Sequence, residues 1–131
     1  MLETITNIDV MEKDIDNLGH VNNSVYSSYF GIARKEWYHK AGLSLEEKQK
    51  RNIGNVIRKI EINFLKEARL GDSLIIITRP LRLGNKSYLL NQNIYNQNHE
   101  CLTNATVTIV MFDTINRKSI KVIEEIARNF K

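Results

Sequence analysis

The sequence predicts an α+β fold in which one long apolar helix lies against an antiparallel sheet. The helix is indicated by a run from residue 23 in which apolar side chains recur at helical spacing. The sheet is indicated by four later segments rich in β-branched and aromatic residues: VIRKIEINFLKEA, SLIIITRPLRL, KSYLLNQNIYNQ and CLTNATVTIVMFD. Short turns at Gly84-Asn85 and Asn98-His99 join the last three of these segments, and such turns favour antiparallel pairing.

The remaining elements follow from local signals along the chain. Residues 4–12, TITNIDVME, read as a first strand, and residues 13–21 read as a loop. The long helix is expected to begin at Asn22 or Asn23, because either side chain can accept hydrogen bonds from the free N–H groups of a first turn. Gly42 is placed to end this helix. Residues 119–129 are expected to form a short terminal helix.

Length and composition predict a single domain, residues 1–131, of an ordinary globular protein. Cys101 is the only cysteine, so an internal disulfide and a thiolate metal cluster are excluded. No apolar run is long enough to cross a bilayer, and the first residues lack the pattern of a signal peptide. The net charge of +4 is scattered and forms no basic stripe. We therefore expect a cytoplasmic protein without a nucleic-acid or membrane partner.

The stretch DIDNLGHVNN, residues 14–23, carries most of the chemistry, and it allows three interpretations. As a calcium loop it fails, because Leu18 and Val25 stand where oxygen ligands are required. Asp16 and His20 could still bind another metal, but no further histidine has ligand spacing to them. As a structural segment it would be an ordinary loop with a helix cap.

The third interpretation is catalytic and pairs a carboxylate with a helix start. Free N–H groups at a helix N-terminus can stabilise an anion that develops during a reaction. A nearby carboxylate can attack a carbonyl or activate water. No nucleophile elbow of the G-x-S-x-G type competes with this arrangement, and Cys101 lies in a predicted strand without a paired base. The pattern is thus compatible with acyl transfer as well as with a purely structural loop.

The same stretch and its continuation resemble a known family. The string D-x-D-x-x-G-H-V-N-N-x-x-Y-x-x-Y-F-x-x-A-R, residues 14–34, resembles the signature of hotdog-fold thioesterases, and in particular of the 4-hydroxybenzoyl-CoA thioesterase-like acyl-CoA thioesterases. NFLKEARLGDSLIIITRPLRLGNKSY resembles the second and third strands of that family. The resemblance implies a five-stranded antiparallel sheet wrapped around one long central helix. It also implies dimers, often paired into tetramers, with the active sites at the subunit interface.

The resemblance implies roles for individual residues. Asp16 matches the catalytic aspartate, and Asn23 matches the helix-start position whose N–H polarises the thioester carbonyl. Gly19, His20 and Asn22 match positions that shape the substrate site, and Asp14 matches an aspartate that we expect to support the loop. From their place beside the Gly84-Asn85 turn, Arg82 and Lys86 are further candidates for contacts with substrate phosphates.

The sequence therefore predicts an acyl-CoA thioesterase that releases a carboxylic acid and free CoA. CoA would be part of the substrate, with no separate cofactor and no metal. Two alternatives stay open at this point. One is a thioesterase acting on acyl groups carried by acyl carrier protein, and the other is a hotdog protein that binds acyl-CoA without hydrolysing it. A homodimer or homotetramer is expected in each case.

Overall fold

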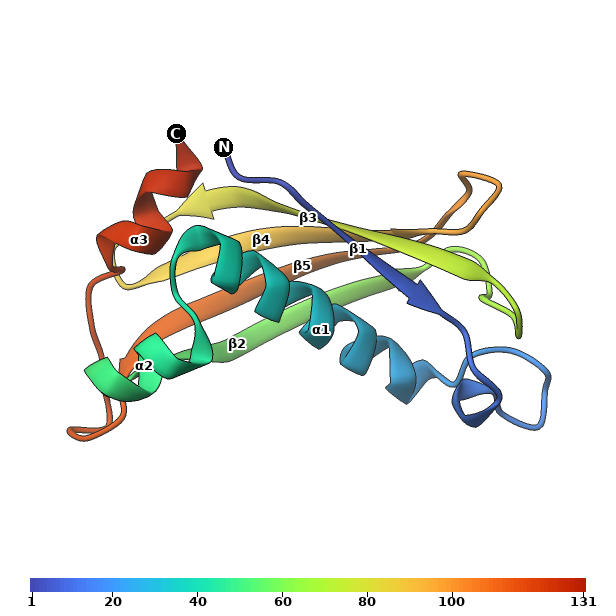
Figure 1. Ribbon diagram of the computed structural model, residues 1–131, viewed down its shortest axis with the longest axis horizontal. Helices are drawn as coiled ribbons and strands as arrows, with labels where there is room; N and C mark the ends of the chain where they lie inside the picture. The colour runs from blue at the N-terminus through green and yellow to red at the C-terminus, as the bar shows by residue number, and fades with distance from the viewer.

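The computed structural model describes residues 1–131 and has a curved antiparallel sheet with one long helix lying across it (Figure 1). The strands are β1 (Thr4–Asp9), β2 (Ile53–Phe64), β3 (Ser73–Leu83), β4 (Ser87–Tyr95), β5 (Cys101–Asp113) and the two-residue β6 (Lys118–Ser119). The helices are α1 (Asn23–Ala41), α2 (Leu45–Arg51) and α3 (Glu124–Ala127), with 3-10 turns η1 (Glu12–Asp14) and η2 (Arg128–Phe130). None of these helices combines the length and the hydropathy that a membrane span requires.

The sheet has the order β1-β3-β4-β5-β2, and every pairing in it is antiparallel. This confirms the predicted five-stranded antiparallel sheet, to which β6 adds a short pairing with the end of β5. β1 and β2 are therefore the two edges. β2 is 12 residues long and none of its residues is buried, whereas β1 has only 6 residues and lies beside α1.

Helix α1 begins and ends where the sequence predicted. Asn22 is the N-cap, and its side chain accepts a hydrogen bond from the Ser24 N–H. Gly42 ends the helix in the left-handed conformation, with φ of 104°, which a residue with a side chain rarely adopts. The eight buried residues of α1 lie against the concave face of the sheet: Tyr26, Tyr29, Phe30, Ala33, Arg34, Trp37, Tyr38 and Ala41. The sheet that curves around this helix explains why so many of its residues are buried.

Three segments differ from the prediction. The first strand, expected over residues 4–12, ends at Asp9, and the 3-10 turn η1 begins at Glu12. Residues 45–51 form α2, which the sequence analysis treated as a polar segment. LEEKQKR has no apolar stripe, so helical periodicity could not reveal it, although the Ser44 side chain caps the helix by accepting from the Glu47 N–H. The terminal helix is shorter than expected, because residues 118–119 pair with β5 before α3 begins at Glu124.

A buried polar contact joins α1 to the centre of the sheet. Gln92, which is fully buried in β4, donates hydrogen bonds to the Phe30 carbonyl and to Thr78 Oγ1, at 3.1 and 3.0 Å. Its Oε1 accepts from Arg34 Nη1 at 3.0 Å. Burial lowers the pKa of the Arg34 guanidinium. Arg34 forms no ion pair, and its buried charge is stabilised by the side chains of Gln92 and Tyr38.

Replacing Gln92 with methionine is expected to lower the free energy of unfolding by about 2–3 kcal/mol, because a hydrogen bond to a buried charged group is lost and the Phe30 carbonyl and Thr78 Oγ1 each lose a donor. Urea denaturation followed by the fluorescence of Trp37, the single tryptophan, measures this change. Gln49→Met, at an exposed position of α2, is the matched control. Equal stability of the two variants would contradict this role for Gln92.

Candidate active site

The loop before α1 is held in place by backbone hydrogen bonds at both of its ends. The Asp16 N–H donates to the His20 carbonyl at 3.0 Å, and the Asn22 N–H donates to the Asp14 carbonyl at 3.0 Å. The Val21 N–H donates to the Ala68 carbonyl at 2.9 Å, which ties the loop to the segment after β2. The loop is therefore a fixed connection that presents its side chains at one end of the helix.

Asp14 supports this loop through hydrogen bonds to its neighbours. Its Oδ2 accepts hydrogen bonds from the Tyr29 hydroxyl at 2.9 Å and from the Met11 N–H at 3.2 Å. Burial and the contact with Asp14 raise the pKa of the Tyr29 hydroxyl above its usual range, so it is held as a donor. Both acceptor contacts fit the supporting role expected for Asp14.

Asp14→Ala is expected to lower the free energy of unfolding by about 1–3 kcal/mol, because two donors lose their acceptor. Tyr29→Phe should lose part of the same contact, so the double variant should be less destabilised than the sum of the two single changes. Thermal denaturation of the three variants measures this coupling. Strict additivity would show that the contact between Tyr29 and Asp14 does not stabilise the loop.

Asp16 is the second carboxylate of the loop, and like Asp14 it is partly exposed. Its side chain is 22% exposed, and its Oδ1 accepts a hydrogen bond from the Leu18 N–H at 2.8 Å. Its Oδ2 lies 3.9 Å from His20 Nδ1. The Leu18 contact forms a tight side-chain turn that orients the carboxylate. Oδ1 of Asp16 thus accepts a hydrogen bond within the loop, while Oδ2 faces His20.

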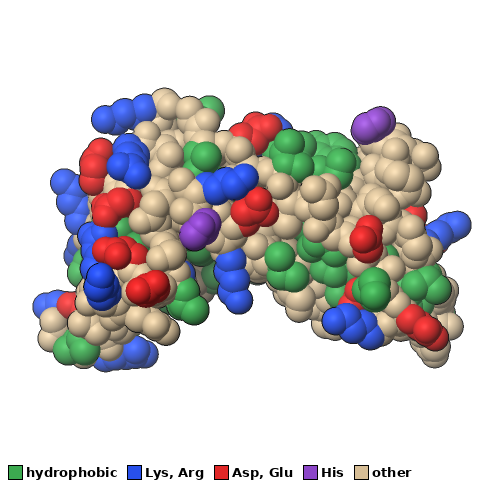
Figure 2. Space-filling model, in the orientation of Figure 1, with side chains coloured by type: hydrophobic (Ala, Val, Ile, Leu, Met, Phe, Trp, Pro, Cys, Tyr) green, Lys and Arg blue, Asp and Glu red, His purple; other side chains and the backbone are tan.

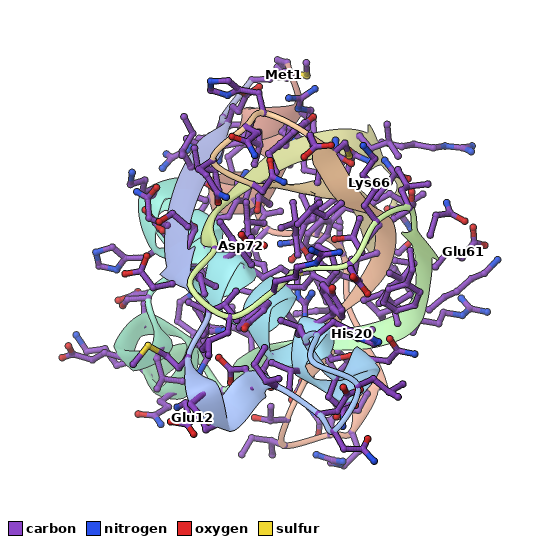
Figure 3. The ribbon with its side chains drawn as sticks, turned by 90° about the vertical axis from the view of Figure 1, so that its right-hand side faces the viewer. Met1, Glu12, His20, Glu61, Lys66 and Asp72 are labelled. Carbon is purple, nitrogen blue, oxygen red and sulfur yellow. The ribbon has the colours of Figure 1, made fainter.

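His20 lies between two carboxylates. Its Nδ1 is 3.9 Å from Asp16 Oδ2, and its Nε2 is 3.9 Å from Glu67 Oε2. Nδ1 also lies 3.2 Å from the Val21 carbonyl oxygen. Figure 3, which views the molecule from this end, shows His20 beside the start of α1. The ring therefore connects the loop that carries Asp16 with the segment after β2.

Asn23 is the first residue of α1, and its backbone N–H has no hydrogen-bond acceptor within the chain. This N–H is one of the free donors that every helix N-terminus leaves, and the helix dipole makes it attractive to negative charge. Asn23 lines a cavity of about 230 Å³. The residues that line this cavity are His20, Asn23, Tyr26, Phe64, Leu65, Lys66 and Glu67.

The structure thus brings together part of the predicted site. His20 and Asn23 line the cavity. Asp16 is not one of the lining residues, and its Oδ2 lies 3.9 Å from Nδ1 of the lining residue His20. Asn22 caps the helix, its Oδ1 accepting from the Ser24 N–H and hydroxyl, each at 3.1 Å. Gly19 has φ of 88°, and a Cβ added to it would meet no atom within 4 Å, so the backbone conformation is what favours glycine there.

Arg82 and Lys86 lie far from these residues within one chain. Ser73, at the start of β3, lies opposite Asp9, just before the loop, whereas Arg82 is near the other end of the same strand. Nine residues of extended chain separate them, or about 30 Å at the usual rise per residue. Any contact between these basic residues and a substrate held at Asn23 therefore requires a second protomer.

Several residues at the cavity were missed by the sequence analysis. Phe64, Leu65, Lys66 and Glu67 come from the end of β2 and the turn after it, 40 or more residues from the loop. Tyr26 is buried, and its hydroxyl accepts a hydrogen bond from the Ala68 N–H at 3.2 Å. These groups are brought together only by the packing of the loop and α1 against the end of β2.

No three His, Cys, Asp or Glu side chains are grouped to hold a metal ion.

Comparison with solved structures identifies the architecture. A 1,4-dihydroxy-2-naphthoyl-CoA thioesterase from Synechocystis matches with a TM-score of 0.88 at 17% identity, covering 98% of this chain and 95% of the other. A protein from Staphylococcus aureus, solved in complex with CoA, matches with a TM-score of 0.92 at 18% identity, covering 98% of this chain and 84% of the other. At these identities the likeness establishes the fold, and the predicted hotdog fold is confirmed.

Sequence comparison gives the family. The acyl-CoA thioester hydrolase YbgC of Escherichia coli is 27% identical over 124 residues, which cover 95% of this chain and 92% of that relative. The long-chain acyl-CoA thioesterase FadM of Escherichia coli is 29% identical over 116 residues, covering 88% and 87% of the two chains. The family model of the thioesterase-like superfamily matches residues 10–130. The chain therefore belongs to the thioesterase-like superfamily, as its resemblance to hotdog-fold thioesterases indicated.

Proposed function

We propose that this protein is an acyl-CoA thioesterase, which hydrolyses a thioester to a carboxylic acid and free CoA. The observation that carries the proposal is the unpaired N–H of Asn23, a residue that lines a cavity together with His20, with the Asp16 carboxylate 3.9 Å from that histidine. The relatedness to YbgC and FadM, whose names describe acyl-CoA thioester hydrolysis, supports the choice of substrate class.

In the proposed reaction the thioester carbonyl oxygen accepts a hydrogen bond from the Asn23 N–H. Asp16 attacks the carbonyl carbon or activates the water that attacks it, and the carbonyl oxygen then carries negative charge. A well-placed oxyanion donor stabilises the transition state by about 3–4 kcal/mol. The C–S bond breaks, water supplies the new acid oxygen, and the CoA thiolate leaves. Because a thiolate is a good leaving group, the chemistry needs neither a strong general acid nor a metal.

His20 would act as a positioning residue in this reaction. Its ring lies between Asp16 and Glu67, so it can fix the direction of the nucleophilic carboxylate without touching the carbonyl. Gly19 and Asn22 would shape the site by setting the loop conformation and the helix start. Arg82 and Lys86 stay predicted contacts of the CoA phosphates, supplied by a second protomer.

We further propose that the protein is a homodimer formed through β2, alone or as half of a tetramer. β2 is a 12-residue edge strand, and exposed edges pair readily with another strand. Five large apolar residues are exposed along it and just after it: Val56, Ile57, Ile60, Phe64 and Leu65. In a two-fold antiparallel pair centred on this strand, Phe64 of one protomer lies opposite the start of β2 in its partner. The partner would then complete the cavity beside Asn23.

The test of the proposed activity is a panel of acyl-CoA esters with aromatic, short-chain and long-chain acyl groups, assayed for thiol release. Hydrolysis of at least one ester is expected, and release from none would contradict the proposal. Matched substrates on acyl carrier protein form the second arm, because a chloroplast acyl-acyl carrier protein thioesterase of Arabidopsis thaliana is 28% identical over 72 residues of this chain. Faster turnover of these substrates would show that the natural substrate carries its acyl group on acyl carrier protein and not on CoA.

We place the activity in the cytoplasm, which suits the free thiol of Cys101.

A further inference from the structure

A basic groove lies at the far end of α1 from the Asp16 loop, between the outer side of α1 and α2. Its volume is about 210 Å³. Its lining residues are Lys35, Tyr38, His39, Leu43, Ser44, Leu45 and Lys48. Three of them carry basic side chains and none is acidic. Figure 2 shows Lys and Arg side chains gathered at this end of the molecule, with acidic side chains among them.

The two lysines of the groove lack the partners that neighbouring cations have. Lys40, on the same helix, pairs with Glu36 at 3.4 Å, whereas neither Lys35 nor Lys48 forms an ion pair. The Lys48 ammonium lies over the Tyr38 ring, 4.8 Å from its centroid. Burial, followed by the charge of Lys35, lowers the pKa of Lys48. Two like charges held close together in a groove repel each other, and a bound anion would remove that repulsion.

The groove continues toward the edge of the sheet. An adjoining groove of about 430 Å³ shares Leu45 and Lys48 with it and runs to the start of β2. Its other lining residues are Gln49, Asn52, Ile53, Gly54, Asn55 and Thr114. In the two-fold pairing proposed above, the start of β2 lies opposite Phe64 of the partner protomer, and Phe64 lines the cavity beside Asn23. This pairing would create a continuous surface that leads from Asn23 of one protomer to Lys48 of the other.

We propose that Lys35, His39 and Lys48 form a phosphate-binding subsite for the CoA part of a substrate whose thioester lies in the active site of the partner protomer. The inference rests on the proposed function and on pairing through β2. CoA carries a diphosphate and a 3′-phosphate, and lysine ammonium groups bind phosphate as point charges. The acyl part, which carries no phosphate, would stay at the Asn23 end.

The first experiment compares acyl-CoA with the acyl-N-acetylcysteamine thioester, which has the same reacting group but no phosphate. Lys35→Ala/Lys48→Ala is expected to raise the KM for acyl-CoA about tenfold or more, with kcat nearly unchanged and with the truncated thioester hydrolysed as by the wild type. Lys40→Ala is the matched control on the same helix, because Lys40 lies outside the groove. An unchanged KM for acyl-CoA, or an equal loss with both substrates, would overturn the proposal.

A binding measurement separates this proposal from the proposed activity. Isothermal titration with CoA, pantetheine and inorganic phosphate needs no hydrolysis, so it can be read even if the wild type releases no thiol. Weaker CoA binding in the double variant, with pantetheine unaffected, is expected. If the double variant no longer binds inorganic phosphate but binds CoA as the wild type does, the groove holds an adventitious ion only, and the assignment to CoA is wrong.

Hybrid dimers test whether the groove serves the partner. Asp16→Asn and Lys35→Ala/Lys48→Ala protomers are co-expressed with different tags, and the hybrid is purified. If the groove serves the partner, one site of the hybrid has both an intact Asp16 and intact lysines, and the wild-type KM returns at about half the wild-type kcat per dimer. A hybrid that keeps the raised KM would place the lysines and Asp16 of one protomer at the same site, which contradicts the proposal.

Discussion

Asp16→Asn is expected to lower kcat for thioester hydrolysis by about 10²- to 10⁴-fold, the range that a positioned carboxylate contributes as a base. The variant keeps the shape of the side chain, and the amide oxygen can still accept the hydrogen bond from the Leu18 N–H. The loop should therefore keep its conformation and the KM should change little. Steady-state thiol release over a range of acyl-CoA concentrations separates the two parameters.

A large rise in KM with unchanged kcat would show instead that Asp16 contributes to binding. His20→Asn offers a useful comparison, because it removes the ring between Asp16 and Glu67 without touching either carboxylate. If His20 only positions the Asp16 carboxylate, His20→Asn should lower kcat by a smaller factor than Asp16→Asn does. Combining the two changes should then add little further loss, since groups that act as a unit are not additive.

Val56→Asp is expected to give a monomer with kcat/KM reduced by about 10²-fold or more. Val56 lies on the edge strand β2 and is 45% exposed in a single chain, so two-fold pairing would bring an unpaired carboxylate from each protomer into the interface. Without the partner, the cavity beside Asn23 would be incomplete and the thioester poorly positioned, which costs rate on this scale. Sedimentation velocity measures the oligomeric state, and thiol release measures the activity.

Ile5→Asp is the matched control, because Ile5 is 53% exposed on β1, the opposite edge of the sheet. This variant should keep the wild-type assembly and rate. Circular dichroism of both variants checks that each one folds. A Val56→Asp protein that stays dimeric would show that β2 is not the interface, and a fully active monomer would show that the site needs no second protomer.

The fold could be predicted where local signals agree. The caps of α1 at Asn22 and Gly42 and the apolar spacing between them are sequence features, and both ends of the helix were placed correctly. The turn at Asn98-His99 was also correct, and His99 adopts a positive φ of 61° there. α2 was missed because a short helix with no buried residue has no apolar stripe to detect. The end of the chain was misjudged because the pairing of β6 depends on the path of β5.

The site could be predicted only as far as it is contiguous in sequence. Asp16, His20 and Asn23 lie within eight residues, and a helix start beside a carboxylate has a recognisable chemistry. The contact of His20 with Glu67 and that of Tyr29 with Asp14 depend on tertiary packing, which no local pattern encodes. The same holds for the cavity residues from β2. The residues alone left open whether the loop is structural or catalytic, and the resemblance to thioesterases favoured the catalytic interpretation.

The most direct test of the account is to measure thiol release by Asp16→Asn and Asp14→Asn side by side, with each rate corrected for the folded fraction. Asp14→Asn keeps an acceptor oxygen for the Tyr29 hydroxyl, so it should fold and retain activity within about tenfold of the wild type. Asp16→Asn should fold equally well and lose nearly all activity. If Asp16→Asn keeps full activity while Asp14→Asn loses it, Asp14 is the reacting carboxylate and the proposed site is wrong.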